Sequence, residues 1–508
     1  MVRGFSSMSR GLALSAKRSP NRPALVEIDR LTLTYAELLN GAIRLANHLR
    51  RKGARPGDNI GILSANSIEH MISLYGVSFA GGVSVAFDPK WTASEISRTI
   101  DAFDCRIVIC DGSLSRLLTD ERRTGISPEI ISYSVSKGSC DLVERLRDES
   151  AEPPPVHVND DDPCTILLTS GTTGVPKGVV RSSRNVETGC LNGVMGKAQT
   201  DNGRELAVVP IFYGSGRGSV VGQIYLGATV YVMPSFDAEH AAHVIDREKI
   251  TAIALAPTMC RRLLRMPNLG HYDFTSLRSL RKAGSPFTLG MASEISERIT
   301  ANIYQGYAST ETGSVSLLGP EEQFRKLGSA GRLEWGVEAD VVDDAGNPLG
   351  PDEDGEVRVR GPSVCQGYYK NPDEEKKAFR DGWFHTGDIG RFDRDGYLFI
   401  VGRIKETIKT GSINVSPREV ELTIGGVAGV EDVAVIGVPD MEWGEAVTAF
   451  VVRSPGSNID DRSIDARCRE VLSGYKIPKR IQFVTEIERN ALGKVTPAFR
   501  EKMKSPTR

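Results

Sequence analysis

A short polar segment in the first half of the chain combines the residue types that bind phosphate groups. An apolar run ends at Thr169, and a stretch of glycine and hydroxyl residues follows it and closes near Lys177. Glycines let successive backbone N–H groups turn towards one anion, hydroxyls add donors, and a lysine adds positive charge. The candidate phosphate-binding residues are Thr169, Ser170, Gly171, Thr172, Thr173, Gly174 and Lys177. The segment predicts a polyphosphate site, with an ordinary glycine-rich hairpin turn as the alternative.

The order of these residues differs from the Walker phosphate loop, in which GxxxxGK[ST] opens a helix. Pro176 stands directly before the lysine and disfavours helical backbone at Val175. Over the thirteen residues from Ile166 to Gly178, the segment instead resembles the phosphate loop of the adenylate-forming enzymes, which include acyl-CoA synthetases, carrier-loading adenylation domains and luciferases. That resemblance favours the phosphate site over the hairpin turn.

A second motif, from Gln305 to Glu311, combines an aromatic ring with a carboxylate. A ring can stack on a purine, and a carboxylate suits Mg²⁺ that is bound together with phosphates. In the adenylate-forming family this motif supplies the adenine-stacking tyrosine and the metal-binding glutamate, which correspond to Tyr307 and Glu311. The resemblance also implies roles in catalysis or adenine binding for Thr310, Gln305, Gly306, Gly284, Ser285 and Pro286.

Asp388 closes a third motif, which begins at Gly382. A carboxylate has two acceptor oxygens, and these match two neighbouring ribose hydroxyls. By itself this residue would be interpreted as a solvated turn aspartate, but the surrounding motif resembles the family's ribose-binding segment. The same resemblance implies that Arg403 reaches the nucleotide.

The segment from Gly402 to Glu421 resembles the family's interdomain hinge and the loop that follows it. The hinge residue is usually Asp or Lys, and here it is Glu406. Lys409 is a candidate for the second half-reaction, although a solvated lysine is the favoured interpretation. Gly411 and Ser412 correspond to the pantetheine tunnel, where a glycine is usual at the serine position, so the Ser412 side chain would narrow the path of a thiol.

Lys494 follows Gly493 at the distance and in the context where the family places its adenylation lysine. A Gly-Lys pair alone would be interpreted as surface, but the preceding run from Tyr475 to Lys479 also matches the family. The resemblance therefore implies that Lys494 is the catalytic lysine.

The acyl pocket is less well defined by the sequence. The family often carries Pro-x-Phe-His there, and Tyr213 stands in place of the histidine. Small residues after it would leave a roomy pocket, or would simply let a helix begin close to a sheet. Arg217 is interpreted as solvent-facing, with a salt bridge to a second substrate carboxylate as the alternative. The candidate pocket residues are Phe212, Tyr213, Gly214, Ser215 and Ala308.

The elements that must position these motifs alternate between helix-like and strand-like segments. Short apolar runs such as 58–63 and 106–110 alternate with helical patterns such as 67–79, which is typical of parallel α/β layers. Residues 328–400 carry short strands and turn signals. We expect an α/β fold: a large N-terminal domain of layered sheets with a small β-rich unit (1–404) and a small mobile α+β C-terminal domain (405–508).

Composition excludes several other classes of protein. The 508 residues carry a net charge of −2, so no basic excess indicates nucleic acid or an anionic membrane. The eight cysteines and seven histidines are scattered, which disfavours a disulfide framework or a zinc site and favours a reducing compartment. The sequence contains no run of about 18 apolar residues, so we expect no transmembrane helix. We expect a cytoplasmic protein, with its oligomeric state, including a homodimer, left open.

The resemblance extends from about Pro20 to Arg500 and identifies the chain as a member of the adenylate-forming enzymes. It implies activation of a carboxylic acid by ATP with Mg²⁺, and transfer of the acyl group to coenzyme A, as in fatty acid metabolism. The roomy pocket favours a medium- or long-chain fatty acid or a bulky hydrophobic acid. The alternatives are an enzyme that loads a separate carrier protein and a non-catalytic nucleotide-binding protein.

Overall fold

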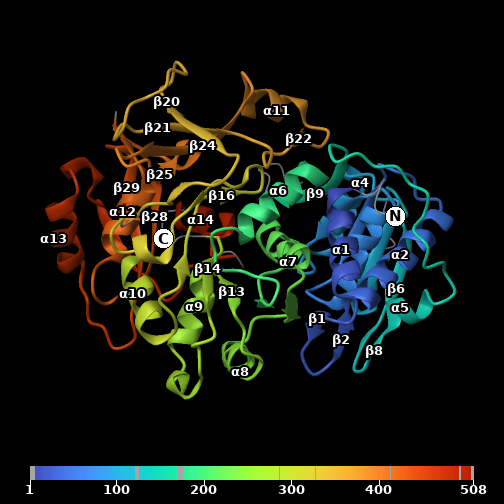
Figure 1. The fold of residues 1–508 in the computed structure, drawn as a ribbon. Coiled ribbons are helices and arrows are strands. Elements are labelled where there is room, and N and C mark those ends of the chain that lie inside the picture. Colours follow the sequence, from blue (N-terminus) through green and yellow to red (C-terminus); the bar gives the residue numbers. More distant parts are fainter. Residues whose placement is uncertain are drawn as a thin grey trace.

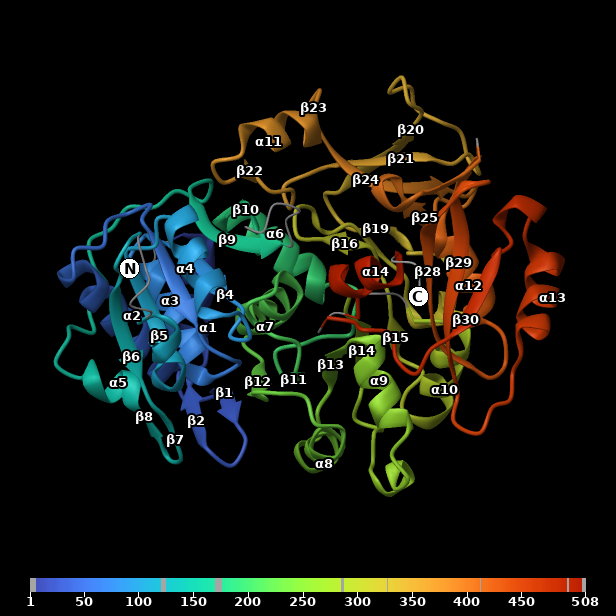
Figure 2. The same cartoon turned by 180° about the vertical axis from the view of Figure 1, so that it is seen from behind.

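The computed structural model describes residues 6–119, 125–169, 176–284, 287–326, 328–411, 413–490 and 493–504. These residues form a large α/β N-terminal domain and a smaller C-terminal domain, as expected (Figure 1). The view from behind places the first helices and strands at one end of the molecule and α13 at the other, with α14 near the middle (Figure 2). The proposed boundary at 404/405 falls in a short 3₁₀ turn, Ile404–Glu406, and stays a prediction.

One mainly parallel sheet carries the segment that leads into the phosphate-type loop. Its strand order is β22–β10–β9–β4–β3–β5–β6. β3 and β4 are buried at every position, because a parallel strand is covered on both faces. The strands are β3 (Asn59–Leu63), β4 (Val83–Phe87), β5 (Ile107–Asp111), β6 (Glu129–Tyr133), β9 (Pro163–Thr169), β10 (Lys177–Ser182) and β22 (Gly367–Tyr368).

A second mainly parallel sheet has the order β15–β14–β13–β11–β12–β1–β2. The carboxyl ends of β14 and β15 lead directly into the Gly284 and Gln305–Glu311 motifs, which is where ligands bind in open α/β sheets. The strands are β1 (Pro23–Glu27), β2 (Leu31–Thr34), β11 (Arg204–Ala207), β12 (Thr229–Val232), β13 (Ala252–Leu255), β14 (Ser279–Lys282) and β15 (Ile303–Tyr304).

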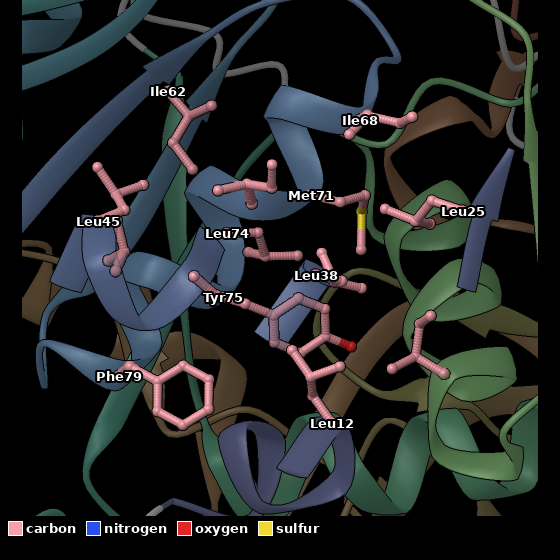
Figure 3. Packing of buried hydrophobic residues seen from close by; sticks show 14 of the residues in the cluster. Leu12, Leu25, Leu38, Leu45, Ile62, Ile68, Met71, Leu74, Tyr75 and Phe79 are labelled. Atoms are coloured by element: carbon pink, nitrogen blue, oxygen red, sulfur yellow. The ribbon is translucent and has the colours of Figure 1, made fainter. Parts of the chain in front are cut away.

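Helices pack on these sheets and build the main core. All twelve residues of α3 are buried, and the Ser67 side chain caps the helix by accepting from the backbone N–H of His70. Figure 3 shows Met71, Leu74 and Tyr75 of α3 packed with Leu12, Leu25 and Leu38. The helices of this domain are α1 (Ser7–Arg18), α2 (Tyr35–Arg51), α3 (Ile68–Phe79), α4 (Ala93–Ala102), α5 (Asp141–Arg145), α6 (Ser183–Val194), α7 (Gly214–Leu226), α8 (Ala238–Glu248), α9 (Pro257–Leu264), α10 (Leu289–Arg298) and α11 (Pro372–Ala378).

The predicted β-rich unit is an antiparallel sheet of order β20–β21–β24–β23, with β25 paired to β24. Two-residue strands connect it to the second parallel sheet and flank its edges. The long strands are β20 (Glu338–Val342), β21 (Gly355–Arg360), β24 (Trp383–Phe392) and β25 (Leu398–Arg403). The short ones are β16 (Ala308–Ser309), β17 (Gly313–Ser314), β18 (Ser316–Leu317), β19 (Arg332–Leu333) and β23 (Phe379–Arg380), with β7 (Val135–Ser136) and β8 (Ser139–Cys140) forming a separate hairpin.

The C-terminal domain is a sheet of order β27–β26–β29–β28, with β30 paired to β29 and helices packed against it. α12 packs on β28 and contacts α13. Its elements are β26 (Ile408–Thr410), β27 (Ile413–Val415), α12 (Pro417–Gly425), β28 (Val430–Asp440), β29 (Gly444–Arg453), α13 (Asp461–Val471), β30 (Arg480–Phe483) and α14 (Pro497–Lys504).

Two sequence expectations about the chain as a whole can be compared with this fold. All eight cysteines are buried and unpaired, as the scattered pattern predicted. In the part of the chain that the structure describes, we find no helix with the length and apolarity that a membrane crossing requires.

Candidate active site

Asp388 is buried and contacts residues from two other motifs, Tyr307 and Arg403. It is 2% exposed, and it stands opposite Arg403 in the register of β24 and β25. Arg403 Nε lies 2.6 Å from Asp388 Oδ1, and the Tyr307 hydroxyl donates to Asp388 Oδ2. Burial, reinforced by the negative charge of Asp388, raises the pKa of Tyr307 well above its usual value. The solvated-turn interpretation of Asp388 is therefore wrong, and the residues matched to ribose, adenine and nucleotide contact each other.

The loop that precedes Tyr307 approaches its neighbours too closely to allow a side chain at Gly306. A Cβ there would collide with the carbonyl oxygen of Ser316. Gln305 Oε1 accepts from the backbone N–H of Phe287 at 3.0 Å, so Gln305 ties this loop to the residues just after Ser285 and Pro286. The glycine is thus required by packing, and the glutamine links the two adenine motifs.

Lys282 is a candidate site residue that sequence reasoning missed. Its ammonium group donates to the carbonyl of Gly306 at 2.8 Å. Burial, together with the positive charges of Arg418 and Lys494, lowers the pKa of Lys282 to about 8. The only signal in the sequence was a lysine two residues before the predicted Gly284 loop.

Glu311 accepts a hydrogen bond from the Tyr368 hydroxyl at 3.2 Å. Tyr368 lies on β22, and its ring is 5.7 Å from Lys177 Nζ. Lys177 is itself ion-paired with Glu374, whose pKa falls to about 2 because the two lysines Lys177 and Lys377 hydrogen-bond it. The positive charge predicted for a phosphate is therefore balanced by a carboxylate in this structure. The motif search found neither Tyr368 nor Glu374.

Two predicted residues next to this group have backbone roles. The carbonyl of Thr310 accepts from Arg181 Nη1 at 2.8 Å, and Arg181 is buried. Thr169 is the last residue of β9 and lies opposite Lys177 in the sheet register. The predicted residues Ser170, Gly171, Thr172, Thr173 and Gly174, together with Ser285, Pro286 and Ser412, lie outside the described residues.

Lys494 brings the C-terminal domain to this site. Its side chain keeps contact with solvent, and its backbone N–H is held by Asn490 Oδ1 at 3.0 Å. Partial burial and the charge of Arg403 lower the pKa of Lys494, while the carboxylates of Asp388, Glu311 and Glu406 act in the opposite direction. Charges that shift one another in this way lie close together. A lysine near the C-terminus is therefore electrostatically coupled to Glu311, Asp388 and Arg403.

The remaining hinge residues lie beside the site. Glu406 pairs with Arg500 at 3.3 Å. Lys409 is exposed, and its backbone N–H donates to Glu445 Oε2 at 2.7 Å, which fits the favoured interpretation of a solvated lysine. Gly411 has a φ of +63° in the turn after β26, and this left-handed conformation favours glycine.

Four of the five predicted acyl-pocket residues, Phe212 to Ser215, lie where α7 begins, and the fifth, Ala308, lies on β16. The rings of Phe212 and Tyr213 lie 4.5 Å apart, and the Tyr213 hydroxyl is 3.4 Å from Asp88 Oδ2. Gly214 and Ser215 form the first turn of α7, and Ser215 and Ala308 are exposed. A Cβ on Gly214 would lie 3.1 Å from Leu167, so this glycine does allow α7 to begin close to the sheet.

The interpretation of Arg217 as solvent-facing is wrong. It is 2% exposed, and its Nη1 reaches Thr165 Oγ1 and, at 3.4 Å, Ser84 Oγ. Burial lowers its pKa to about 10. Its position in α7 turns it towards β4 and β9, because α7 packs on the sheet at that point, which the spacing of the sequence could not reveal.

Comparison with known proteins agrees with this geometry. The family model described as AMP-binding enzyme matches residues 12–369, and the model described as AMP-binding enzyme C-terminal domain matches residues 419–494. The chain belongs to the AMP-binding enzyme family. As its motifs indicated, this AMP-binding enzyme is an acid–thiol ligase of the AMP-forming type.

Relatives of this AMP-binding enzyme differ in the acid that their names specify. Feruloyl-CoA synthase of Amycolatopsis sp is 33% identical over 94% of this chain and 95% of its own length. Long-chain-fatty-acid--CoA ligase FadD13 of Mycobacterium tuberculosis is 33% identical over 94% of both chains. Fatty acid--[acyl-carrier-protein] ligase ScoC of Streptomyces coeruleorubidus is 32% identical over 94% of this chain and 93% of its own.

A solved structure of similar architecture has a nucleotide bound. ATP-bound MatB from Rhodopseudomonas palustris superposes on this enzyme with a TM-score of 0.90 at 29% identity, covering 98% of this chain and 99% of that one. The likeness extends over both domains, so the fold expected for an adenylate-forming enzyme is confirmed.

Proposed function

We propose that this enzyme joins a carboxylic acid to coenzyme A in two steps at one site. In the first step the acid's carboxylate oxygen attacks the α-phosphorus of ATP, and the bond to pyrophosphate breaks. In the second step the thiol sulfur of coenzyme A attacks the carbonyl carbon of the acyl-adenylate, and AMP leaves. The observation that carries this proposal is the contact of Tyr307 and Arg403 with Asp388, at a site to which Lys494 is coupled electrostatically.

Charge explains why these groups gather. Both reactants of the first step are anionic, so the site must neutralise their repulsion. Lys494 and Arg403 place positive charge beside the nucleotide motifs, and Lys282 adds a third cation. Fixed donors directed at transition-state charge each contribute about 3 kcal/mol. Asp388, already oriented by Tyr307, supplies acceptor oxygens for the ribose hydroxyls.

Mg²⁺ fits the residues present. Among the described residues no group of three or more His, Cys, Asp or Glu side chains could hold a metal ion alone. A single carboxylate is enough for Mg²⁺ that is bound mainly through phosphates and water, and Glu311 would supply it. When bound, the ion would neutralise phosphate charge and orient the leaving pyrophosphate.

The acid that we propose is a medium- or long-chain fatty acid or a bulky hydrophobic acid, because open space lies beside α7 and the first turn of that helix is exposed. Support for coenzyme A as acceptor comes from the two CoA ligases among the relatives. The relative ScoC, whose name specifies an acyl carrier protein, keeps a carrier protein as the second candidate. Buried, unpaired thiols suit the cytoplasm as the compartment.

A pyrophosphate-release screen over fatty, aryl and dicarboxylic acids, with and without coenzyme A, tests this function. We expect turnover that requires one class of acid and accelerates with coenzyme A. Adenylation that only a phosphopantetheinylated carrier protein accelerates would support the second candidate. ATP binding without pyrophosphate release from any acid would overturn the ligase proposal in favour of a non-catalytic nucleotide-binding protein.

A further inference from the structure

The first observation concerns four glycines in one helix. Gly214, Gly216, Gly218 and Gly222 all lie in α7, although a glycine inside a helix costs about 1 kcal/mol relative to alanine. Three of them are explained by close packing. A Cβ would meet Leu167 at Gly214, the carbonyl of Pro210 at Gly216, and Val194 and the carbonyl of Cys190 at Gly222.

Gly218 differs from the other three. Among the described residues nothing lies within 4 Å of a Cβ placed there, yet the residue is half-buried. Packing against protein therefore does not require glycine at this position. Free space beside a half-buried helix face is what a bound small molecule needs.

The residues next to Gly218 form a polar stripe along the helix. Ser215, Ser219 and Gln223 are each four positions apart and so share one face. Ser215 is exposed, Ser219 is 9% exposed and Gln223 is 1% exposed. With a rise of 1.5 Å per residue, Ser219 and Gln223 lie about 6 and 12 Å along the helix from Ser215. The stripe therefore runs from the predicted acyl pocket into the protein interior.

At its buried end the stripe joins an ion pair between β11 and β14. Glu205 is 1% exposed and pairs with Arg281, which is 9% exposed. The Ser219 hydroxyl donates to Glu205, and Arg281 Nη2 donates to Ser219 Oγ at 2.6 Å. Gln223 Nε2 donates to Glu205 Oε2 at 2.7 Å and also to Gln199 Oε1. The inner end of the stripe is therefore polar, despite its burial.

A second buried ion pair lies beside the first. Lys197 Nζ is 3.0 Å from Glu334 Oε1 and donates to the carbonyl of Asn192 at 2.9 Å. The positive charge of Arg281 helps to lower the pKa of Lys197, after the larger effect of burial, so the two cations are neighbours. Two cations and two carboxylates balance the charge of this cluster.

Some hydrogen-bonding capacity in the cluster is unused. Within the described part of the chain, four of its buried polar atoms have no partner: Asn192 Oδ1, Gln199 Nε2, Arg281 Nε and Glu334 Oε2. Two of these are donors and two are acceptors. Leaving a buried polar group unpaired costs about 1–3 kcal/mol, so their concentration in one cluster indicates a polar ligand group.

Resting on the proposed function, we infer that the acid carries a neutral hydrogen-bonding group, such as a phenol or alcohol hydroxyl, at the end remote from its carboxylate. Ser219, Gln223 and Arg281 form the set of residues that selects it. A plain alkyl chain would leave the cluster unpaired. A second carboxylate would meet two carboxylates whose counter-ions are already in place. Arg217 does not supply a carboxylate site here, because it lies two residues from Ser219 and turns to the opposite side, towards Ser84 and Thr165.

Matched pairs of acids test this inference. Pyrophosphate release is measured with cinnamic and 4-hydroxycinnamic acids, with octanoic and 8-hydroxyoctanoic acids, and with the dicarboxylic acid of the same length. We expect kcat/KM to favour the hydroxylated member of at least one pair by about 100-fold or more, since a site built to bond a hydroxyl rejects the analogue that lacks it. Equal rates within both pairs, or a preference for the plain or dicarboxylic acid, would overturn the inference.

Variants of the stripe make the test specific. Ser219→Ala and Gln223→Leu should each reduce the hydroxyl preference about tenfold or more while retaining turnover of the plain acid. Ser73→Ala is the matched control, because this buried serine on α3 donates to the Glu69 carbonyl at 2.7 Å, outside the polar cluster. Unchanged preference in both stripe variants, with melting temperatures like that of the control, would refute the role of these residues. Absence of pyrophosphate release with every acid would instead refute the proposed ligase.

Discussion

Charged side chains at this site are paired with groups of opposite charge, and we expect an anionic substrate to bind among them. Asp388 is paired with Arg403, and Lys177 is paired with Glu374. Burial, and after it the charge of a neighbouring cation, lowers the pKa values of Lys494 and Lys282. A polyanion such as ATP would relieve that repulsion, so binding and catalysis should both depend on these lysines.

Replacing Lys494 tests catalysis at this scale. We expect Lys494→Ala to slow pyrophosphate release by about 100-fold or more, because a donor directed at transition-state charge is lost. The melting temperature should stay within about a degree of wild type, since the side chain is open to solvent. Lys502→Ala, another exposed lysine of the same domain, is the control. Wild-type adenylation in Lys494→Ala would contradict the role.

The pKa of Lys282 predicts a pH dependence. Below pH 8 the lysine is charged and attracts ATP, and above it the charge is lost, so kcat/KM for ATP should fall as pH rises through about 8. Lys282→Met should have a lower kcat/KM at pH 7 and should lose this inflection. The free energy of unfolding of wild type should rise between pH 8 and 10.5, because the unfolded chain binds a proton at Lys282 that the folded chain lacks. Lys282→Met should lack this rise. Identical pH profiles for both proteins would rule this out.

At the scale of elements, the sequence pattern predicts where strands and helices form, whereas packing decides which charged side chains are buried. The strands 58–63 and 106–110 and the helix 67–79 were predictable because apolar runs bounded by turn signals leave few alternatives. Motifs that follow one another in the family's order along the chain led to Tyr307, Glu311, Asp388 and Lys494 as candidates. Arg217 and Lys282 were not, because burial of a charge depends on which element faces it. For α7, the small residues allowed two explanations, a roomy acyl pocket or a helix that begins close to the sheet. Only the packing around each glycine distinguishes them.

The open space at Gly218 gives a prediction for this helix. Gly218→Ala should stabilise the protein by up to about 1 kcal/mol and leave activity intact, because alanine is the better helix former. Gly218→Leu should fill the space and lower kcat/KM for the preferred acid at least tenfold, while a short acid such as butyric acid is spared. Thermal denaturation and pyrophosphate release measure the two effects. Equal losses for long and short acids would show that the space does not hold the substrate.

For the whole molecule, a small group of ion pairs joins the two domains. Arg261 of α9 donates to the Glu431 carbonyl at 2.8 Å and lies 3.4 Å from Asp432, and Arg265 pairs with Glu431. Arg489, from the same domain as Asp432, holds that carboxylate at 2.9 Å. These contacts help to hold Lys494 at the site. Because the hinge resemblance implies a mobile C-terminal domain, we expect this domain to rotate for thioester formation, and that rotation must break them.

Removing this connection should shift the balance between the two half-reactions. Partly exposed pairs contribute at most about 1 kcal/mol each, so the Arg261→Ala and Arg265→Ala double variant should adenylate a few-fold more slowly. Transfer from preformed acyl-adenylate to coenzyme A should be unchanged or faster. High salt should reproduce the effect in wild type, because screening weakens such pairs. Single-turnover measurements separate the steps, with Arg247→Ala, which removes a pair inside the N-terminal domain, as control. Slowing of both steps equally would refute the connection.

The burial of the cysteines determines whether they react with the product that the enzyme itself makes. Its proposed product is a thioester, which can transfer its acyl group to any accessible cysteine thiolate with release of the coenzyme A thiol. Burial raises the pKa of every one of the eight cysteines, so none offers a ready nucleophile for acyl capture. The native protein should therefore react slowly with a thiol reagent, and Met441→Cys, at a fully exposed turn, should add one fast-reacting group. Such a thiol would be a background-free attachment point for a dye that follows rotation of the C-terminal domain during turnover.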